Sequence, residues 1–214
     1  MPKISTQDFL EFEQIREGVM ILKNKALRAV VMVSSLSFAL KSEEEQNAIL
    51  YQFQSFLNSL DFSTQILVHS RRLNVTGYLE KLNELEKKEE NDLLKMQIAE
   101  YREFISSIMS GGRIMQKNFY IIVPFARAEA GGMEAVKTLK FSTKKEIALT
   151  KEEFQRAKSQ LWQRVEFVVL GLRRCDLQAI PLNSHEIIEL LWSFYHPQEA
   201  ESGRYPEIPP ELIT

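Results

Sequence analysis

Phosphate binding is the first chemistry to look for, because it needs only glycine, lysine and a hydroxyl at fixed spacing. A P-loop closes the backbone N–H groups of a glycine-rich turn around the phosphates and continues with Lys and Ser or Thr. None of the eight glycines in the 214 residues is followed by such a pair, and no G-x-G-x-x-G motif occurs. The sequence therefore predicts no nucleotide site of either familiar kind.

The three histidines, His69, His185 and His196, are scattered along the sequence. His69 lies inside a predicted strand, and we interpret it as a packed or half-exposed residue rather than a ligand. Only His185, with Glu186 or Glu189, can share one helix face. This pairing is weaker than the H-E-x-x-H pattern of zinc enzymes, so we interpret it as a solvated helix start.

Nucleophilic chemistry has little support either. Cys175 is the single cysteine, so no disulfide or zinc–thiolate cluster can form within the chain, and reducing cytosol is the expected compartment. A G-x-S-x-G nucleophile elbow is absent. We therefore predict no catalytic residue, no cofactor and no metal site, and interpret the chain as not an enzyme.

Charge and hydropathy limit the classes of partner. The net charge is −2 and the pI is about 6.0, whereas a nucleic-acid binder usually has a basic domain or stripe. The pairs Arg71–Arg72 and Arg173–Arg174 are interpreted as solvated ends of helices or strands rather than a phosphate track. The first residues show no apolar signal core. The longest apolar run, Phe119–Ala126, is far shorter than the ~20 residues of a membrane helix.

The stretch Leu27–Leu60 changes character sharply at Ser42. Before it, Val30–Val33 is typical of a strand buried on both faces. After it, Ser42 and Glu45 form a capping box at the start of a helix, and glutamates occupy the positive end of the helix dipole. Apolar residues then recur at helical spacing, namely Ile49, Leu50, Phe53, Phe56, Leu57 and Leu60.

Further elements follow from the same two periodicities. Besides the strand that runs from Leu27 towards Leu40, we predict strands over Ile15–Lys23, Thr64–Ser70, Asn118–Phe125 and Gln178–Leu182, and helices over Ser42–Leu60, Tyr78–Met109, Thr150–Cys175 and Asn183–Phe194. The link Asn24-Lys25 predicts a β-hairpin. Thr150 with Glu153 predicts a second capping box, and Asn183 with Glu186 predicts a third helix start. The helix after Thr150 is expected to be amphipathic, with an apolar stripe of Phe154, Ala157, Leu161, Val165, Val168, Val169 and Leu172. The segment Ala126–Thr150 is interpreted as a long loop or an incomplete hairpin, with a short strand around residues 137–141.

The predicted helix Tyr78–Met109 is too long for a small sheet. At ~1.5 Å per residue it would extend about 50 Å. Its middle, Glu86–Asp92, has no apolar residue over two turns. That segment must project into solvent, break, or meet another chain, and a solvated charged face is the favoured reading.

The chain is predicted to form a single α+β domain over residues 1–196. We expect a mixed β-sheet of about four to six strands with helices packed on it, one of them long and charged. The strands before and after Ser42–Leu60 would form a right-handed crossover if they are parallel. Residues 197–214 are interpreted as a Pro-rich polar tail or linker.

Several stretches of the sequence form a recognisable set: Gly18–Lys23, Leu27–Ser35, Phe38–Gln46, Tyr51–Phe62, Gln65–Leu73, Phe119–Phe125 and Gly171–Leu182. Together they resemble the TraC-like N-terminal domain of conjugative-transfer, type IV secretion ATPases. The resemblance covers roughly Gln7 to Pro197 and has no catalytic motif. It implies a free-standing copy of this domain in a bacterial secretion apparatus, without the P-loop motor domain that would begin after Thr214 in full-length relatives.

Three hypotheses follow, in order of preference. The first is a non-enzymatic assembly component of a conjugation or type IV secretion apparatus. It would be cytoplasmic or peripheral at the inner membrane and would bind other subunits, with the motor ATPase as one candidate. The second is a nucleic-acid-handling accessory of DNA transfer that uses Arg71, Arg72, Arg173 and Arg174, although the charge disfavours a nucleic-acid partner. The third is an enzyme of a type without a recognisable motif.

Overall fold

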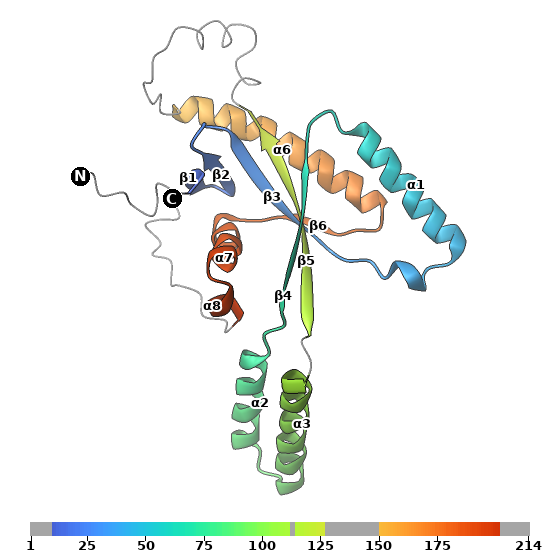
Figure 1. The fold of residues 1–214 in the computed structure, drawn as a ribbon, viewed down its shortest axis with the longest axis vertical. Coiled ribbons are helices and arrows are strands. Elements are labelled where there is room, and N and C mark those ends of the chain that lie inside the picture. The colour runs from blue at the N-terminus through green and yellow to red at the C-terminus, as the bar shows by residue number, and fades with distance from the viewer. Residues whose placement is uncertain (1–9, 112–113, 127–149, 202–214) are drawn as a thin grey trace, which may run out of the picture. The chain divides into compact units, whose positions relative to one another are not determined.

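A computed structural model of the chain describes residues 10–111, 114–126 and 150–201. They form an α+β fold with a six-stranded sheet, which confirms the predicted class and strand number (Figure 1). The described residues group into two compact units. One unit holds those up to Val68 and those between Asn118 and Ile188. The other holds those between His69 and Lys117 and those from Glu189 onward.

Three strands come first along the chain, and helices and strands are interspersed after them. The strands are β1 (Phe12–Arg16), β2 (Val19–Leu22), β3 (Leu27–Val33), β4 (Gln65–Arg72), β5 (Met115–Phe125) and β6 (Ala179–Pro181). The helices are the short 3₁₀-helix η2 (Phe38–Leu40), α1 (Glu43–Ser59), α2 (Thr76–Lys88), α3 (Asp92–Gly111), α6 (Lys151–Arg174), α7 (Ser184–Tyr195) and α8 (Pro197–Glu201).

β3 is the middle strand in the order β1-β2-β3-β5-β4, and other strands pair with both of its edges. Along one edge it pairs with β5 over its whole length, from Leu27 opposite Phe125 to Val33 opposite Phe119. Along the other edge it pairs with β2 near Leu27 and with β6 from Val31 to Val33. The predicted buried run is confirmed apart from Met32, which is exposed. The strand ends at Val33, and Phe38–Leu40 forms η2 instead of continuing it.

The sheet is antiparallel where a mixed sheet was expected. The pairings β1–β2, β2–β3, β3–β5 and β3–β6 are all antiparallel. In the strand order β1-β2-β3-β5-β4, β5 lies between β3 and β4. β3, α1 and β4 therefore do not form a crossover between neighbouring strands. The strand that separates them begins only at Met115, and local periodicity carries no information about such a distant pairing.

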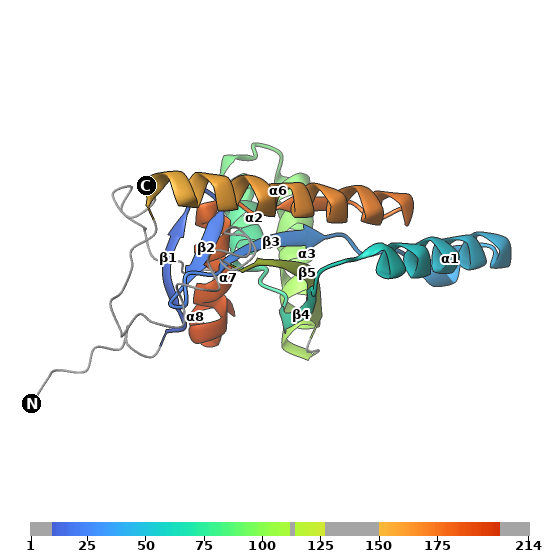
Figure 2. The ribbon, with the colours of Figure 1, turned by 90° about the horizontal axis from the view of Figure 1, so that it is seen from above.

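α6 lies along one face of the sheet and supplies six of the 17 buried residues of the core cluster (Figure 2). The predicted capping box is present: the Glu153 N–H donates to Thr150 Oγ1 (3.2 Å), and the Thr150 N–H donates to Glu153 Oε2 (3.1 Å). Burying a large apolar side chain contributes roughly 1.5–3 kcal/mol. The side chains that α6 buries recur at helical spacing: Phe154, Ala157, Leu161, Val165, Val168 and Leu172.

α1 begins at the predicted capping box, in which the Glu45 N–H donates to Ser42 Oγ (3.3 Å). Its apolar stripe is only partly covered, because Phe56 is its one buried side chain. Phe56 packs directly over Gly171 of α6. A Cβ atom on Gly171 would lie 2.3 Å from Phe56 Cδ2, closer than any two such carbons can approach. The two helices therefore meet at a contact that requires glycine.

The predicted strand Ile15–Lys23 is wrong as one element, because a tight turn divides it into β1 and β2. Glu17 (φ 52°) and Gly18 (φ 75°) form this turn. Two consecutive positive φ angles are typical of a two-residue type I′ hairpin. Glutamate is uncommon at such a position, so Glu17-Gly18 was not recognised as a turn. The second hairpin, predicted at Asn24-Lys25, is confirmed, with Lys25 at φ 63°.

The predicted long charged helix Tyr78–Met109 is two helices, α2 and α3, which pack against each other as a hairpin. The break lies within the charged segment Glu86–Asp92. Asn91 caps α3, since its Oδ1 accepts from the Leu93 N–H at 2.9 Å. Lys87 and Lys88 end α2, and Asp92 begins α3. Lys87, Lys88 and Asp92 thus lie where each of them complements a helix dipole. The charged segment is therefore a junction between two helices.

The C-terminal expectations are confirmed in part. α7 starts at the predicted cap, with the Glu186 N–H donating to Asn183 Oδ1 (3.0 Å). The tail interpretation is wrong for Pro197–Glu201, which forms α8 with Ala200 buried. The rest of residues 197–214, and the loop predicted over Ala126–Thr150 except its two ends, lie outside the described residues. The domain boundary at 196 stays a prediction. In the described ranges, no helix has the length and apolarity to span a membrane.

Candidate interaction surface

An open groove of about 700 Å³ lies along α6 in the first unit. One side of the groove consists of α6 side chains at helical spacing, which lie next to the buried stripe of that helix. The other side is β6, where Ile180 is 65% exposed. We call this feature the α6–β6 groove. Its lining residues are Gln155, Lys158, Ser159, Trp162, Gln163, Val165, Glu166, Val169, Arg173, Ala179, Ile180 and Pro181.

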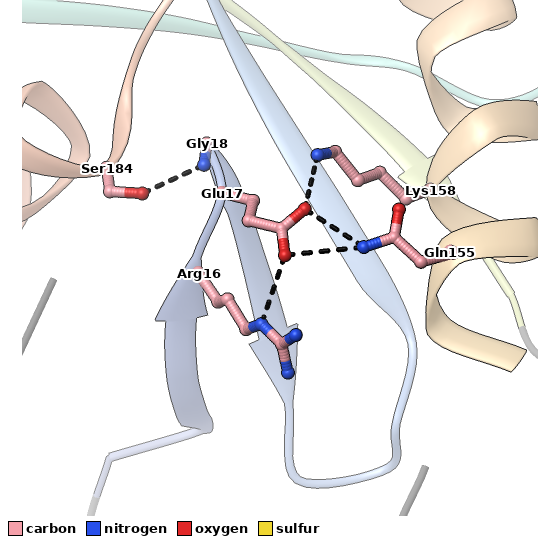
Figure 3. Close-up of polar contacts among 6 residues, drawn as sticks. All are labelled: Arg16, Glu17, Gly18, Gln155, Lys158 and Ser184. Carbon is pink, nitrogen blue, oxygen red and sulfur yellow. Dashed lines mark hydrogen bonds and ion pairs between the residues drawn. The ribbon is translucent and has the colours of Figure 1, made fainter. Parts of the chain in front are cut away.

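One end of the α6–β6 groove is fixed by polar contacts with the β1–β2 turn (Figure 3). The Lys158 ammonium and the Gln155 amide donate to the Glu17 carboxylate, at 2.5 Å and 3.2 Å. These donors hold the pKa of Glu17 below its ordinary value. The Gly18 N–H donates to Ser184 Oγ (2.8 Å), a buried contact that joins the turn to the start of α7. The conformational cost of the positive φ at Glu17 is thus offset by the contacts that its own carboxylate makes.

The other end of the groove carries an exposed cation. Arg173 lies in the last turn of α6, where the negative end of the helix dipole favours a positive charge. Lys158, at the first end, is already neutralised by Glu17. The apolar side chains of Trp162, Val169 and Ile180 lie between these ends. The groove therefore offers apolar side chains with the Arg173 cation at one end, and the exposed Glu166 carboxylate also belongs to its lining.

β6, on one side of the groove, is poorly suited to pairing with an added strand from another protein. Leu182 N–H donates to Val30 O, and Ser34 N–H donates to Gln178 O, so Ile180 directs its backbone groups towards β3. Ala179 and Pro181 face the outer edge, and Pro181 has no N–H to donate. Recognition at β6 must therefore use side chains such as Ile180.

The three histidines have different surroundings in the structure. His69 is half-buried against Phe194, with ring centroids 4.6 Å apart, and burial followed by the nearby Arg71 charge lowers its pKa. His196 stacks on Trp192 at 3.6 Å. Glu186, the candidate partner of His185, is occupied by the Asn183 cap. Among the described residues, no three His, Cys, Asp or Glu side chains are grouped so as to hold a metal ion.

Cys175 is a structural residue. It is fully buried at the C-terminal cap of α6, and burial raises the pKa of its thiol. Its sulfur is 3.6 Å from the Gly171 carbonyl oxygen, to which the thiol donates. A protonated, buried thiol is a poor nucleophile.

The two arginine pairs lie in different units. Arg71 and Arg72 end β4 in one unit, whereas Arg173 and Arg174 form the last turn of α6 in the other. Both members of the second pair fit the dipole of their own helix. The nucleic-acid hypothesis, which uses both pairs, stays a prediction.

Sequence reasoning missed the lining of the α6–β6 groove. The helix periodicity that identified the buried stripe of α6 leaves Gln155, Lys158 and Trp162 on its flank as ordinary surface residues. Ile180 lies in a strand predicted from five residues. The signal that could have found the groove is an aromatic residue, Trp162, placed next to an apolar stripe that is already complete.

The comparison with known families identifies the chain. The model of the archaeal TraC-like domain matches residues 13–197, which include nearly all of the described fold. The protein belongs to this TraC-like family. The membership confirms the resemblance found in the sequence and relates the protein to conjugation and secretion. No curated protein and no solved structure shows significant similarity to it. The family description names archaeal proteins, so the expected bacterial inner membrane stays a prediction.

Proposed function

We propose that this protein is a non-enzymatic assembly component of a conjugation or type IV secretion apparatus and that it acts through protein–protein contacts. The family match over residues 13–197 is the observation that carries the proposal. The α6–β6 groove supports the mode of action. Small-molecule sites usually enclose most of their ligand, whereas an open groove with apolar side chains suits a helix or loop of another protein.

The partner is another subunit of the apparatus, with the motor ATPase as the first candidate, at the cytoplasmic face of the membrane. Its docking segment would place apolar side chains on Trp162, Val169 and Ile180. An acidic residue at one end would meet Arg173. This pattern of apolar contacts with one rim charge is usual for non-obligate interfaces.

A pull-down from the native host tests both parts of the proposal. The tagged full chain, cross-linked in cells, should recover other subunits of the apparatus. Ile180→Glu places a charge in the groove and should reduce that recovery at least tenfold. Phe167→Glu is the matched control, because Phe167 is an exposed apolar residue of α6 outside the groove lining.

The outcomes separate the two parts. If no apparatus subunit is recovered with the unaltered chain, the assembly role is wrong. Equal recovery with Ile180→Glu would contradict the groove as the docking site. Calorimetric titration with magnesium-ATP checks the non-enzymatic part: we expect no saturable heat, and tight binding or turnover would contradict it.

A further inference from the structure

The α2–α3 hairpin has no buried core. No side chain of α2 is buried, and none is buried between Asp92 and Met109 of α3. The seam between the two helices is only half-buried. Helices of this length are marginal in water without tertiary packing. The hairpin therefore needs a further contact surface to be stable.

α3 carries two apolar stripes rather than one. Ile98, Ile105 and Met109 lie in the half-buried seam, on the side where Arg102 reaches α2 through Asn83 (3.0 Å) and Glu86 (3.3 Å). The second stripe is exposed and follows a 3-4-3-4 spacing, the period of a coiled-coil seam. Its members are Leu94, Gln97, Tyr101, Phe104 and Ile108.

The exposed stripe of α3 continues on α2. The hydroxyls of Tyr78 and Tyr101 are 3.4 Å apart, so these two residues share one face of the hairpin. Leu85 lies seven residues after Tyr78 and therefore on the same side of α2. We call Tyr78, Leu85, Leu94, Tyr101, Phe104 and Ile108 the hairpin face.

A second open groove of about 650 Å³ lies on another side of the hairpin. Charged side chains share its lining with apolar ones, among them Met96, which is 60% exposed. The groove is lined by Thr76, Leu79, Glu80, Asn83, Met96, Ala99, Glu100, Arg102, Glu103 and Ser106. The hairpin face differs from this groove because it contains no charged side chain.

We propose that the hairpin face binds the same face of a second copy of this chain, so that two α2–α3 hairpins form a four-helix bundle. This inference does not depend on the proposed function. The six side chains are 40% to 58% exposed. At roughly 200 Å² for a large side chain, they offer about 600 Å² of apolar surface. A stable interface needs about 800 Å² per partner, which rim contacts bring within reach.

The rims of the hairpin face favour a copy of the same chain as the occupant. Lys81 and Lys88 border the face on α2, with Glu84 between them, and Glu100 lies on α3 between the face and the second groove. When α2 of one copy lies over α3 of the other, the net positive rim of α2 meets the negative rim of α3. Gln97 is the one polar residue within the heptad seam. A single polar residue in such a seam fixes register and the number of helices.

Sedimentation equilibrium of the purified full chain tests the proposal. We expect a monomer–dimer equilibrium at micromolar concentration. Phe104→Lys with Ile108→Lys should weaken dimerisation about 100-fold, roughly tenfold for each apolar contact replaced by a charge. Glu103→Lys with Ser106→Lys is the matched control, because it adds lysines to the same turns of α3 on the side of the second groove. It should leave the equilibrium unchanged.

A second measurement keeps the test decisive if the lysine variant loses helix. Hydrogen exchange of the unaltered chain should show amide protection in α2 and α3 that rises with protein concentration, while protection in α6 stays constant. If the chain is still monomeric at a protein concentration 100 times the expected dissociation constant of the dimer, the proposal is wrong. Concentration-independent protection, or equal dimerisation by both variants, would also overturn it.

Discussion

The layer of α6 on the sheet and the α2–α3 hairpin use the same helical periodicity with opposite results. In α6, one apolar stripe meets a sheet and six of its side chains are buried. In α3, two apolar stripes exist, and the single neighbouring helix half-covers one of them. A sheet offers a wide apolar floor, whereas two helices offer each other one seam. The comparison teaches that periodicity identifies a helix, while the number of its neighbours decides what is buried.

The largest expected effect contrasts the two cores directly. Leu161→Ala removes a fully buried side chain of α6 and should lower the free energy of unfolding by about 3 kcal/mol. Ile105→Ala removes a half-buried side chain of the hairpin and should cost about 1 kcal/mol, because less surface loses its contacts. Urea unfolding followed by circular dichroism measures both. Equal losses would mean that the hairpin has a core after all.

The contact between α1 and α6 should be the next most sensitive position. Gly171→Ala places a methyl group against the Phe56 ring and should cost about 2 kcal/mol through overpacking. In a Phe56→Ala background the collision disappears, so the same change should be nearly neutral there. A double-mutant cycle on the unfolding free energy measures this coupling. Additive effects would show that α1 does not rest on Gly171.

The hairpin should respond locally to loss of its cap. Asn91→Ala removes the acceptor for the Leu93 N–H and should destabilise the start of α3 by about 1 kcal/mol. Hydrogen exchange should be faster in the first turn of α3 and unchanged in α6. Glu90→Ala, in the same connection, serves as the control. Faster exchange throughout α6 would contradict the independence of the two regions.

The smallest effect is a pH dependence at the β1–β2 turn. Because donation from Lys158 and Gln155 lowers the pKa of Glu17, the contact stabilises the fold above the ordinary carboxyl value of 4.5. That contribution is lost as the pH falls from 4.5 through the lower folded-state value. The stability gap between the unaltered chain and Glu17→Gln should therefore shrink below pH 4.5. Thermal unfolding at pH 7 and pH 3 measures it, and Lys158→Met should abolish the change.

Much of the local structure could be predicted because its causes lie within a few residues. Three helix starts were recognised from Ser42, Thr150 and Asn183, each with a glutamate three positions later, and all three caps are present. The buried stripe of α6 was likewise readable from spacing alone. The family resemblance was also visible in the sequence, and the family match confirms it.

The remaining features depend on contacts between distant residues. Glu17 can occupy a positive-φ turn only because Lys158 and Gln155 hold its carboxylate, about 140 residues away. No local pattern in the sequence specifies that β5 lies between β3 and β4 in the sheet. The α6–β6 groove has the same origin, since Ile180 and Trp162 come from separate elements. The break at Asn91 is the exception, because a helix cap was present in the sequence and the charged residues around it concealed it.

The two-sided pairing of β3 has a consequence for how the chain matures on the ribosome. Val31 pairs with Pro181, so part of this strand waits for a partner that is synthesised 150 residues later. Until then, the backbone N–H and C=O groups along this edge of β3 have no strand partner in the nascent polypeptide. Unpaired strand edges of this kind promote aggregation. Chains released before residue 179 should therefore be insoluble, or bound by chaperones, whereas chains that reach Leu182 can close the sheet.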